Sequence, residues 1–152
     1  MRVVRYDPIY KEDIERLCKA FSEESLNEYN VGTREDTVGV VLKSVEQGCF
    51  LLITDEGKAV GVIAGLMVKG IATGDPALQE IIWYVDKEYR SNGKMLLDQF
   101  EEYGKMQGAT MIVMCLMCNS MEERLDKVYT RLGYKRFEVQ YMKELPNARI
   151  NA

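Results

Sequence analysis

The sequence predicts one α/β (α+β) domain in which a central mixed sheet is flanked by helices. Two observations support this prediction. Strand-like apolar runs alternate with segments of helical apolar spacing, in the order βααβββαβαββ. The length of 152 residues suits a single domain that buries most of its apolar surface, and no internal repeat or low-complexity segment interrupts it.

The N-terminal third is predicted to contain a strand and two helices. Residues 2–6 combine valines with charged side chains and stop at Asp7-Pro8, as a strand followed by a turn does. A first helix is predicted from four apolar positions at helical spacing, namely Ile14, Leu17, Cys18 and Phe21. After a polar, aperiodic loop over residues 22–32, a second helix is predicted to present Val38, Val41, Leu42 and Val45 on one face.

The rest of the chain is predicted to alternate strands with helices. A hairpin is expected over residues 49–54 and 59–68, a compact strand at 80–85, and an amphipathic helix at 95–106 that ends at Gly108. The continuous apolar run at 110–116 is typical of a strand covered on both faces. A helix at 122–132, capped by Gly133, is followed by predicted closing strands at 134–136 and 139–142.

The charge and hydropathy of the chain exclude several classes of protein. The formal net charge is -4, whereas nucleic-acid-binding domains carry a basic patch or stripe, so no nucleic-acid partner is expected. No apolar run approaches the length that spans a bilayer, and the N-terminus lacks the apolar core of a signal peptide. We therefore expect a cytoplasmic protein without a membrane partner, and the acidic balance favours a cationic or neutral small molecule.

The cysteine and histidine content limits the chemistry. The four cysteines lie inside apolar or helical patterns, which predicts free thiols in a reducing compartment. The chain has no histidine, so a metal site lacks its commonest ligand and no metal is expected. The same absence removes the Ser-His and Cys-His pairs of covalent catalysis. Carboxylate, tyrosine, lysine and backbone groups remain as candidates.

The loop at residues 89–95 has the composition of an anion site, because it joins the strand at 80–85 to the N-terminus of the next helix. Free N–H groups and the helix dipole favour an anion there. Arg90 and Lys94 add positive charge, Ser91 and Asn92 add donors, and Gly93 permits a positive φ or a close backbone approach. A plain strand-to-helix turn that uses glycine for geometric reasons explains the same loop, so both interpretations stay open.

Four sequence blocks in the C-terminal half form a joint pattern. They are Glu80-Ile-Ile-Trp-Tyr-Val85, Tyr89-Arg90 with Gly93, Leu96-Leu97 with Phe100-Glu101, and Val128-Tyr-Thr-Arg-Leu-Gly-Tyr-Lys135. Together they resemble the GNAT family of N-acetyltransferases, and the resemblance extends over nearly the whole chain. It implies the GNAT acyl-CoA N-acyltransferase fold, with a mostly antiparallel sheet, and an acyltransferase that uses acetyl-CoA as cosubstrate.

The resemblance also implies which residues hold the coenzyme. In the family, the backbone of the central strand, here Tyr84 and Val85, pairs with the pantetheine amides, and the next loop binds the pyrophosphate. The corresponding loop positions are Arg90, Ser91, Asn92, Gly93, Lys94 and Met95. Met95 stands where the family pattern has Gly or Ala, and the loop is shorter than that pattern. Asn119 resembles a position that hydrogen-bonds the pantetheine arm, although turn chemistry or helix capping also explains an asparagine there.

Two residues match catalytic positions of the family. Glu80 resembles the carboxylate that, in some members, takes a proton from the acceptor amine through water, a role that needs burial to raise its pKa. The alternative is a solvated glutamate at the end of a strand. Tyr129 resembles the tyrosine that protonates or stabilises the departing thiolate, and a phenol stays protonated at neutral pH. The alternative is a helix tyrosine that packs its ring on the sheet.

Successive parts of the single domain are expected to have different functions. Residues 1–79 would shape the acceptor site, residues 80–145 would bind acetyl-CoA, and residues 146–152 would form a flexible tail. The segment between the first two helices carries acidic, amide and aromatic side chains that suit a protonated amine, although a solvated acidic loop has the same composition. These side chains are Glu23, Glu24, Glu28, Tyr29 and Asn30.

The leading hypothesis is direct transfer of an acetyl group from acetyl-CoA to a primary amine of a small molecule or peptide. One alternative is a non-catalytic binding or structural protein that keeps the GNAT fold. Another is an N-acetyltransferase that acts on proteins or peptides. The sequence leaves open whether two chains pair as a homodimer through their closing strands.

Overall fold

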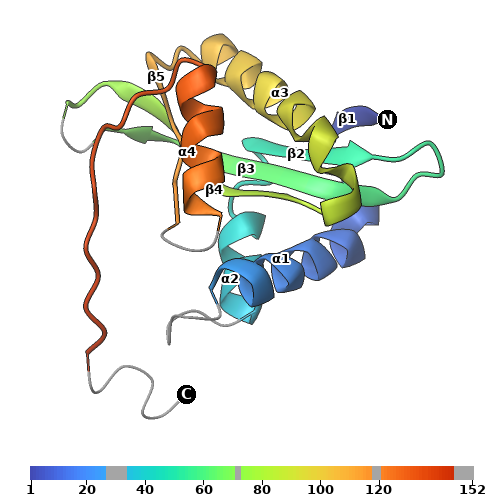
Figure 1. Ribbon diagram of the computed structural model, residues 1–152. Helices are drawn as coiled ribbons and strands as arrows, with labels where there is room; N and C mark the ends of the chain where they lie inside the picture. Colours follow the sequence, from blue (N-terminus) through green and yellow to red (C-terminus); the bar gives the residue numbers. More distant parts are fainter. Residues whose placement is uncertain (27–33, 71–72, 118–120, 146–152) are drawn as a thin grey trace.

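The computed structural model describes residues 1–26, 34–70, 73–117 and 121–145 (Figure 1). Its strands and helices follow one another along the chain almost as the sequence predicts. The strands are β1 (Arg2–Arg5), β2 (Gly48–Ile53), β3 (Ala59–Lys69), β4 (Pro76–Val85) and β5 (Met111–Val113). The helices are α1 (Lys11–Ser25), α2 (Arg34–Leu42), α3 (Gly93–Met106) and α4 (Glu122–Arg131), with short 3-10 turns η1 (Pro8–Tyr10) and η2 (Lys87–Asn92).

The five strands form one sheet in the order β1-β2-β3-β4-β5. The first three pairings are antiparallel, and β4 pairs with β5 in parallel. A short turn joins β2 to β3, in which Gly57 supplies the positive φ of 87°, whereas α1 and α2 lie between β1 and β2 along the chain. The parallel pair needs a crossover, which α3 provides. The prediction of a mixed, mostly antiparallel sheet flanked by helices is confirmed.

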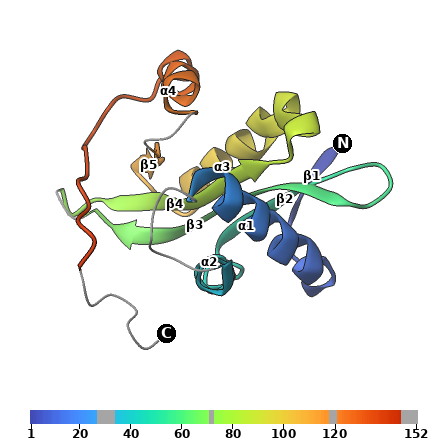
Figure 2. The same cartoon turned by 60° about the horizontal axis from the view of Figure 1, so that its bottom comes forward.

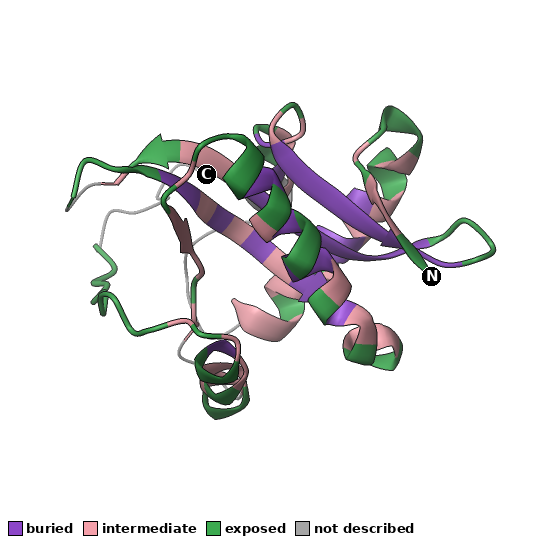
Figure 3. Ribbon diagram, turned by 90° about the horizontal axis from the view of Figure 1, so that it is seen from above, coloured by how far each residue is buried: buried purple, intermediate pink, exposed green. Residues whose placement is uncertain are grey.

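Helices cover both faces of the sheet. In Figures 1 and 2, α1 and α2 lie on one side, and α3 and α4 lie on the other. Two apolar clusters correspond to these layers: Ile14 and Val41 belong to the first, and Leu96 and Phe100 to the second. Figure 3 shows the central strands buried along most of their length. A strand with both faces covered reads as a continuous apolar run, which is the pattern of β2 and β3.

Two predicted strands are wrong. The described residues 121–145 contain α4 but no strand, although closing strands were expected at 134–136 and 139–142. Tyr134 is held, because its N–H donates to the Tyr129 carbonyl and its hydroxyl donates to Glu101 at 2.7 Å. Beyond it the chain runs exposed, away from the sheet (Figure 1). Alternating side chains favour a strand only when neighbours pack against them, and Val139 and Tyr141 of this segment are exposed.

Other predictions hold with shifted limits. The strand expected at 80–85 begins earlier, at Pro76, and the helix expected at 95–106 begins at Gly93. The strand expected at 110–116 is confined to Met111–Val113. No helix in the described part of the chain is long and apolar enough to cross a bilayer.

Candidate active site

β4 pairs with β5 only near the start of β4. The ladder joins Ala77, Leu78 and Gln79 to Met111, Ile112 and Val113. β4 then continues to Val85, and within the described chain no ladder pair joins residues 80–85 to β5. A strand edge of this kind presents N–H and C=O groups to an added strand or an extended ligand.

A β-bulge in β4 marks the place where the ladder with β5 ends. Ala64 of β3 faces Ile82, whereas the next residue, Gly65, faces Glu80, so Ile81 is the extra residue. Bulges bend a strand and redirect its side chains, and they are frequent next to active sites. Gly65 allows the close approach, because a Cβ there would lie 2.5 Å from the Gln79 carbonyl oxygen and 2.6 Å from Phe100 Cζ.

Glu80 lies at this bulge and is buried. Its side chain is inside the structure, with the residue only 7% exposed. The Cys115 N–H donates to Glu80 Oε2 at 3.0 Å. Burial raises the pKa of the carboxyl to about 7, although hydrogen bonds from Cys115 act in the opposite direction. A carboxyl with such a pKa can take up and release a proton near neutral pH, so the burial that the sequence-based role requires is present.

Tyr129 approaches Cys115 from α4. Its hydroxyl donates to the Cys115 carbonyl at 3.1 Å, and its ring centroid lies 5.9 Å from that of Trp83. Burial, followed by the negative charge of Glu80, raises the pKa of the phenol, so the hydroxyl keeps its proton. The N–H of Cys115 therefore binds Glu80 while its C=O binds Tyr129. The structure brings the two predicted catalytic residues to one short stretch of backbone.

Trp83 carries a buried donor that the sequence does not reveal. Its indole Nε1 is buried and has no hydrogen-bond partner among the described residues. The indole lies beside the first residue of α3, since Nε1 would be 4.0 Å from a Cβ at Gly93. Buried donors are nearly always paired, so an unpaired one next to a helix N-terminus is a candidate contact for a ligand.

The predicted anion loop forms η2 and the start of α3. The Asn92 side chain makes no capping hydrogen bond at the start of α3, where the Gly93 N–H already donates to the Arg90 carbonyl of η2. Gly93 has a helical φ of -59°, so this position does not need glycine for a positive φ, which was one of the two uses expected from the sequence. Lys94 pairs with Asp98 at 2.7 Å on the exposed side of the helix, and Ser91 is exposed. Met95 packs against the apolar cluster beneath α3.

The side chain of Arg90 binds α1 and the end of β4. Its Nη2 donates to both carboxylate oxygens of Glu24, at 2.7 and 2.8 Å, and its Nε donates to the Val85 carbonyl at 3.0 Å. The guanidinium also lies over the Tyr84 ring, 5.7 Å from its centroid. Tyr84 and Val85, the two strand residues expected to pair with the coenzyme, are both buried and belong to the clusters on opposite faces of the sheet.

Several predicted site residues lie outside the described residues. Asn119 is one of them, and so are Glu28, Tyr29 and Asn30 of the segment expected to shape the acceptor site. Of that acidic group, Glu23 and Glu24 are described, at the end of α1. The three described cysteines, Cys18, Cys49 and Cys115, are free thiols. No group of three or more metal-ligating side chains occurs among the residues that the structure describes.

Comparison with known proteins identifies the family of this chain. The model of the acetyltransferase (GNAT) family matches residues 11–134, which include Glu80, Tyr129 and the loop between them. The chain belongs to the GNAT acetyltransferase family. The resemblance inferred from the four sequence blocks is therefore confirmed. No curated protein matches the chain.

Solved structures of other acetyltransferases share this GNAT fold. A putative acetyl transferase from Pyrococcus furiosus has a TM-score of 0.72 at 20% identity, over 94% of this chain and 98% of that one. AAC(6')-Iy, solved with the bisubstrate analog CoA-S-monomethyl-acetylneamine, has a TM-score of 0.70 at 17% identity, over 94% and 97%. A ribosomal-protein-alanine N-acetyltransferase from Brucella melitensis biovar Abortus 2308 has 0.70 at 16%, over 95% and 100%. At these identities the likeness concerns the fold.

Proposed function

We propose that this GNAT protein is an N-acetyltransferase that transfers an acetyl group from acetyl-CoA directly to a primary amine. The observation that carries the proposal is the pair formed by Glu80 and Tyr129 on the two sides of the Cys115 peptide. Amine acetylation requires a base and an acid with different pKa values. Glu80 and Tyr129 provide such a pair at the point where β4 and β5 separate.

The residues present fit a coenzyme. Among the described residues β4 has no ladder partner in β5 over residues 80–85, so the backbone groups of this edge that side chains do not occupy can pair with the pantetheine amides as an added strand would. The indole N–H of Trp83 is a buried donor that lacks an acceptor among the described residues. The start of α3, where the Asn92 side chain makes no cap and Lys94 lies close by, has the positive end of a helix dipole that suits a pyrophosphate. Ser91 and Asn92 add donors, and we keep Asn119 as a further candidate for the pantetheine arm.

The bound coenzyme would supply the acetyl thioester, and the side chains of the chain would move the protons. Glu80 would accept the first proton from the ammonium form of the acceptor, either directly or through water. The neutral nitrogen would then form a bond to the acetyl carbon while the carbon–sulfur bond breaks. Tyr129 would donate its hydroxyl proton to the departing thiolate, for which the hydroxyl turns away from the Cys115 carbonyl, and the second proton of the nitrogen, lost as the amide forms, would restore the phenol. Backbone near Val85 polarises the thioester carbonyl. No covalent enzyme intermediate is needed.

The acceptor is proposed to be a cationic amine. The net charge of -4 favours a positively charged substrate over an anionic one. Among proteins with the same fold, one was solved with an analog that joins coenzyme A to acetylneamine, and another is named for a ribosomal-protein alanine. Both names refer to acceptors with an amino group. We infer a small-molecule or peptide amine of this kind.

The test is an acceptor screen that reads free thiol. Wild-type chain and acetyl-CoA are incubated with polyamines, aminoglycosides, amino acids and peptides, and Glu80→Gln is run beside each. We expect at least one amine to release thiol well above hydrolysis, and Glu80→Gln to abolish most of that release. A chain that binds coenzyme A yet releases no thiol with any amine would instead favour a non-catalytic member of the family.

A further inference from the structure

Arg90 connects three parts of the fold through one side chain. Its Nη2 binds Glu24 in the last turns of α1, its Nε binds the Val85 carbonyl at the end of β4, and its charge lies over the Tyr84 ring. Glu24 and Arg90 are 66 residues apart in the sequence. Each of their side chains is only 23% exposed, so the ion pair is largely shielded from water.

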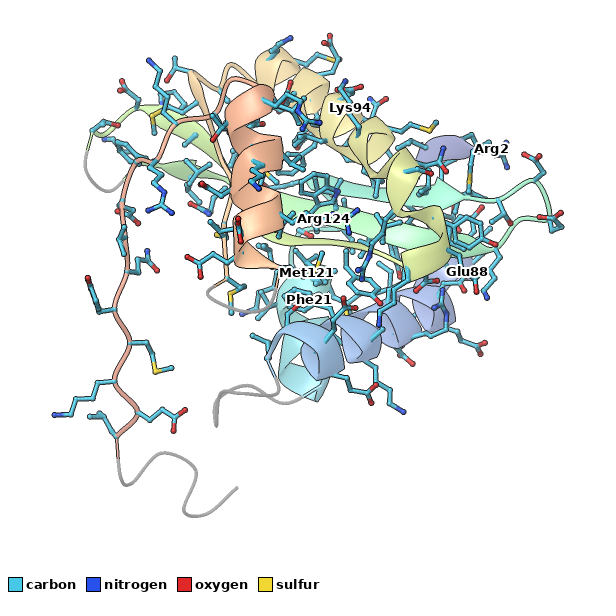
Figure 4. All side chains as sticks on the ribbon, in the orientation of Figure 1. Arg2, Phe21, Glu88, Lys94, Met121 and Arg124 are labelled. Atoms are coloured by element: carbon cyan, nitrogen blue, oxygen red, sulfur yellow. The ribbon has the colours of Figure 1, made fainter. Side chains whose placement is uncertain are left out.

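Nη2 and Nε of this guanidinium are already engaged by Glu24 and Val85. A phosphate that drew Arg90 toward the start of α3 would compete with these contacts and would leave the Glu24 carboxylate, largely shielded, without its partner. Removing one member of a shielded ion pair is strongly unfavourable. Lys94 has no such obstacle, because its partner Asp98 is exposed. In Figure 4, Lys94 on α3 and Phe21 on α1 lie on opposite sides of the sheet.

Phe21 extends the same contact on the α1 side. Its ring centroid lies 6.4 Å from that of Tyr84 at an edge-on angle of 73°. Interaction with Glu24 is among the causes that raise the pKa of Tyr84, after burial. Phe21, Glu24, Tyr84 and Arg90 therefore form a cluster that fixes the end of α1 against the end of β4. We name it the α1–β4 clamp.

We propose that Arg90 is a positioning residue of the α1–β4 clamp and not a ligand of the coenzyme pyrophosphate. This inference rests on the proposed function. Through Glu24, Arg90 holds the helix that borders the acceptor side. Through the Val85 carbonyl, it holds the backbone next to the reacting thioester. Loss of the clamp should therefore impair acceptor use, while the coenzyme keeps its contacts with the start of α3 and with Lys94.

The two roles of Arg90 predict opposite results for coenzyme binding. Calorimetry with coenzyme A is carried out on the wild type, Arg90→Gln and Glu24→Gln, and acceptor KM is measured with the amine that releases most thiol. We expect both variants to change the Kd for coenzyme A less than about threefold and to raise acceptor KM at least about fivefold. This difference separates an effect on coenzyme binding from an effect on acceptor use. Arg90→Lys, which keeps the charge, should restore part of the acceptor KM.

Glu12→Gln is the matched control. Glu12 is exposed in the first turn of α1, at the opposite end of this helix from Glu24, so its loss changes the net charge equally and leaves the clamp intact. It should leave both parameters unchanged. The double variant Glu24→Gln with Arg90→Gln should resemble either single variant, because the two residues act as one unit.

The inference and the proposed function fail in different ways. If Arg90→Gln weakens coenzyme A binding about tenfold or more while Glu24→Gln does not, Arg90 is a phosphate ligand and the inference is overturned. An unchanged acceptor KM in Glu24→Gln also overturns it. A wild-type chain that binds no coenzyme A contradicts the proposed function itself. Thermal unfolding of each variant shows whether it is folded, and Arg90→Lys replaces Arg90→Gln if the latter is not.

Discussion

At the residue scale, the chemistry depends on the ionisation of Glu80. Burial places its pKa at about 7, and the chain contains no histidine that would titrate in the same range. A general base must be deprotonated to act. The rate that depends on Glu80 is therefore low below its pKa and rises as the pH passes through about 7.

Glu80→Gln should remove this rise and lower kcat/KM by about 10²-fold or more, because general bases contribute on that order. The measurement is the pH profile of thiol release on both sides of neutrality, for wild type and variant with the same amine. The amine titrates identically in the two experiments, so the difference between the profiles belongs to Glu80. Profiles of the same shape and height would exclude Glu80 as the base.

Tyr129 and Tyr134 provide a matched pair of tyrosines. Their rings lie 5.6 Å apart, but the Tyr129 hydroxyl donates to Cys115 and the Tyr134 hydroxyl donates to Glu101. Tyr129→Phe should lower kcat by about 10²-fold, the contribution of a general acid, and change coenzyme affinity far less. Steady-state kinetics and calorimetry give the two values. Tyr134→Phe should keep kcat near that of the wild type, and an equal loss in both variants would point to packing.

The candidate site was predictable only in part. Glu80, Tyr129 and the loop at residues 89–95 were identified from their sequence blocks. The peptide of Cys115 was not, because a backbone N–H and C=O have no signature in the side chain. The contacts of the Arg90 side chain were also not predictable, because its partner Glu24 lies 66 residues earlier in the sequence, on a helix. A cation in an anion loop suggests phosphate binding, and only the three-dimensional fold reveals a competing carboxylate.

At the scale of elements, the bulge of β4 shapes the site. A run such as residues 80–85 is apolar on both faces, so its sequence contains no alternation from which a register shift could be read. The existence of the strand was predictable, but the displacement at Ile81 was not. The bulge depends on Gly65 in β3, where no side chain fits.

Gly65→Ala should lower the free energy of unfolding by about 1–3 kcal/mol, because the added methyl group meets backbone at 2.5 Å. Chemical denaturation measures the change. Gly39→Ala is the control, since nothing lies within 4 Å of a Cβ at this position in α2. It should stabilise the chain by about 0.5–1 kcal/mol through helix propensity. Equal effects of the two substitutions would refute the close contact at Gly65.

At the scale of the whole molecule, the C-terminal segment is the place where the observed fold differs from the fold predicted from the sequence. The order of strands and helices along the chain and a sheet flanked by helices were predicted, and the closing strands do not form. Phe137, Val139 and Tyr141 alternate along this segment and are exposed, Tyr141 by 95%. Exposed apolar side chains gathered in one stretch are typical of a surface that contacts another molecule.

We expect this segment to drive self-association of the chain, the homodimer that the sequence left open. A second copy offers the same segment and the same β5, so one contact repeated by two-fold symmetry satisfies both chains. Val139→Lys with Tyr141→Lys should shift the chain toward monomer in light scattering across a concentration series. Ile9→Lys, at an apolar residue 78% exposed in η1, is the control and should change nothing. A wild type that is monomeric at every concentration would contradict this expectation.

We propose that the edge of β4 beyond its ladder with β5 and the start of α3 form a coenzyme site in this molecule. Calorimetric titration of the wild-type chain with acetyl-CoA, up to millimolar ligand, tests this site without knowledge of the acceptor. Saturable binding of one coenzyme per chain is expected, weakened when Trp83→Phe removes the buried indole N–H. No heat of binding at any ligand concentration, from a chain shown to be folded, would refute the site.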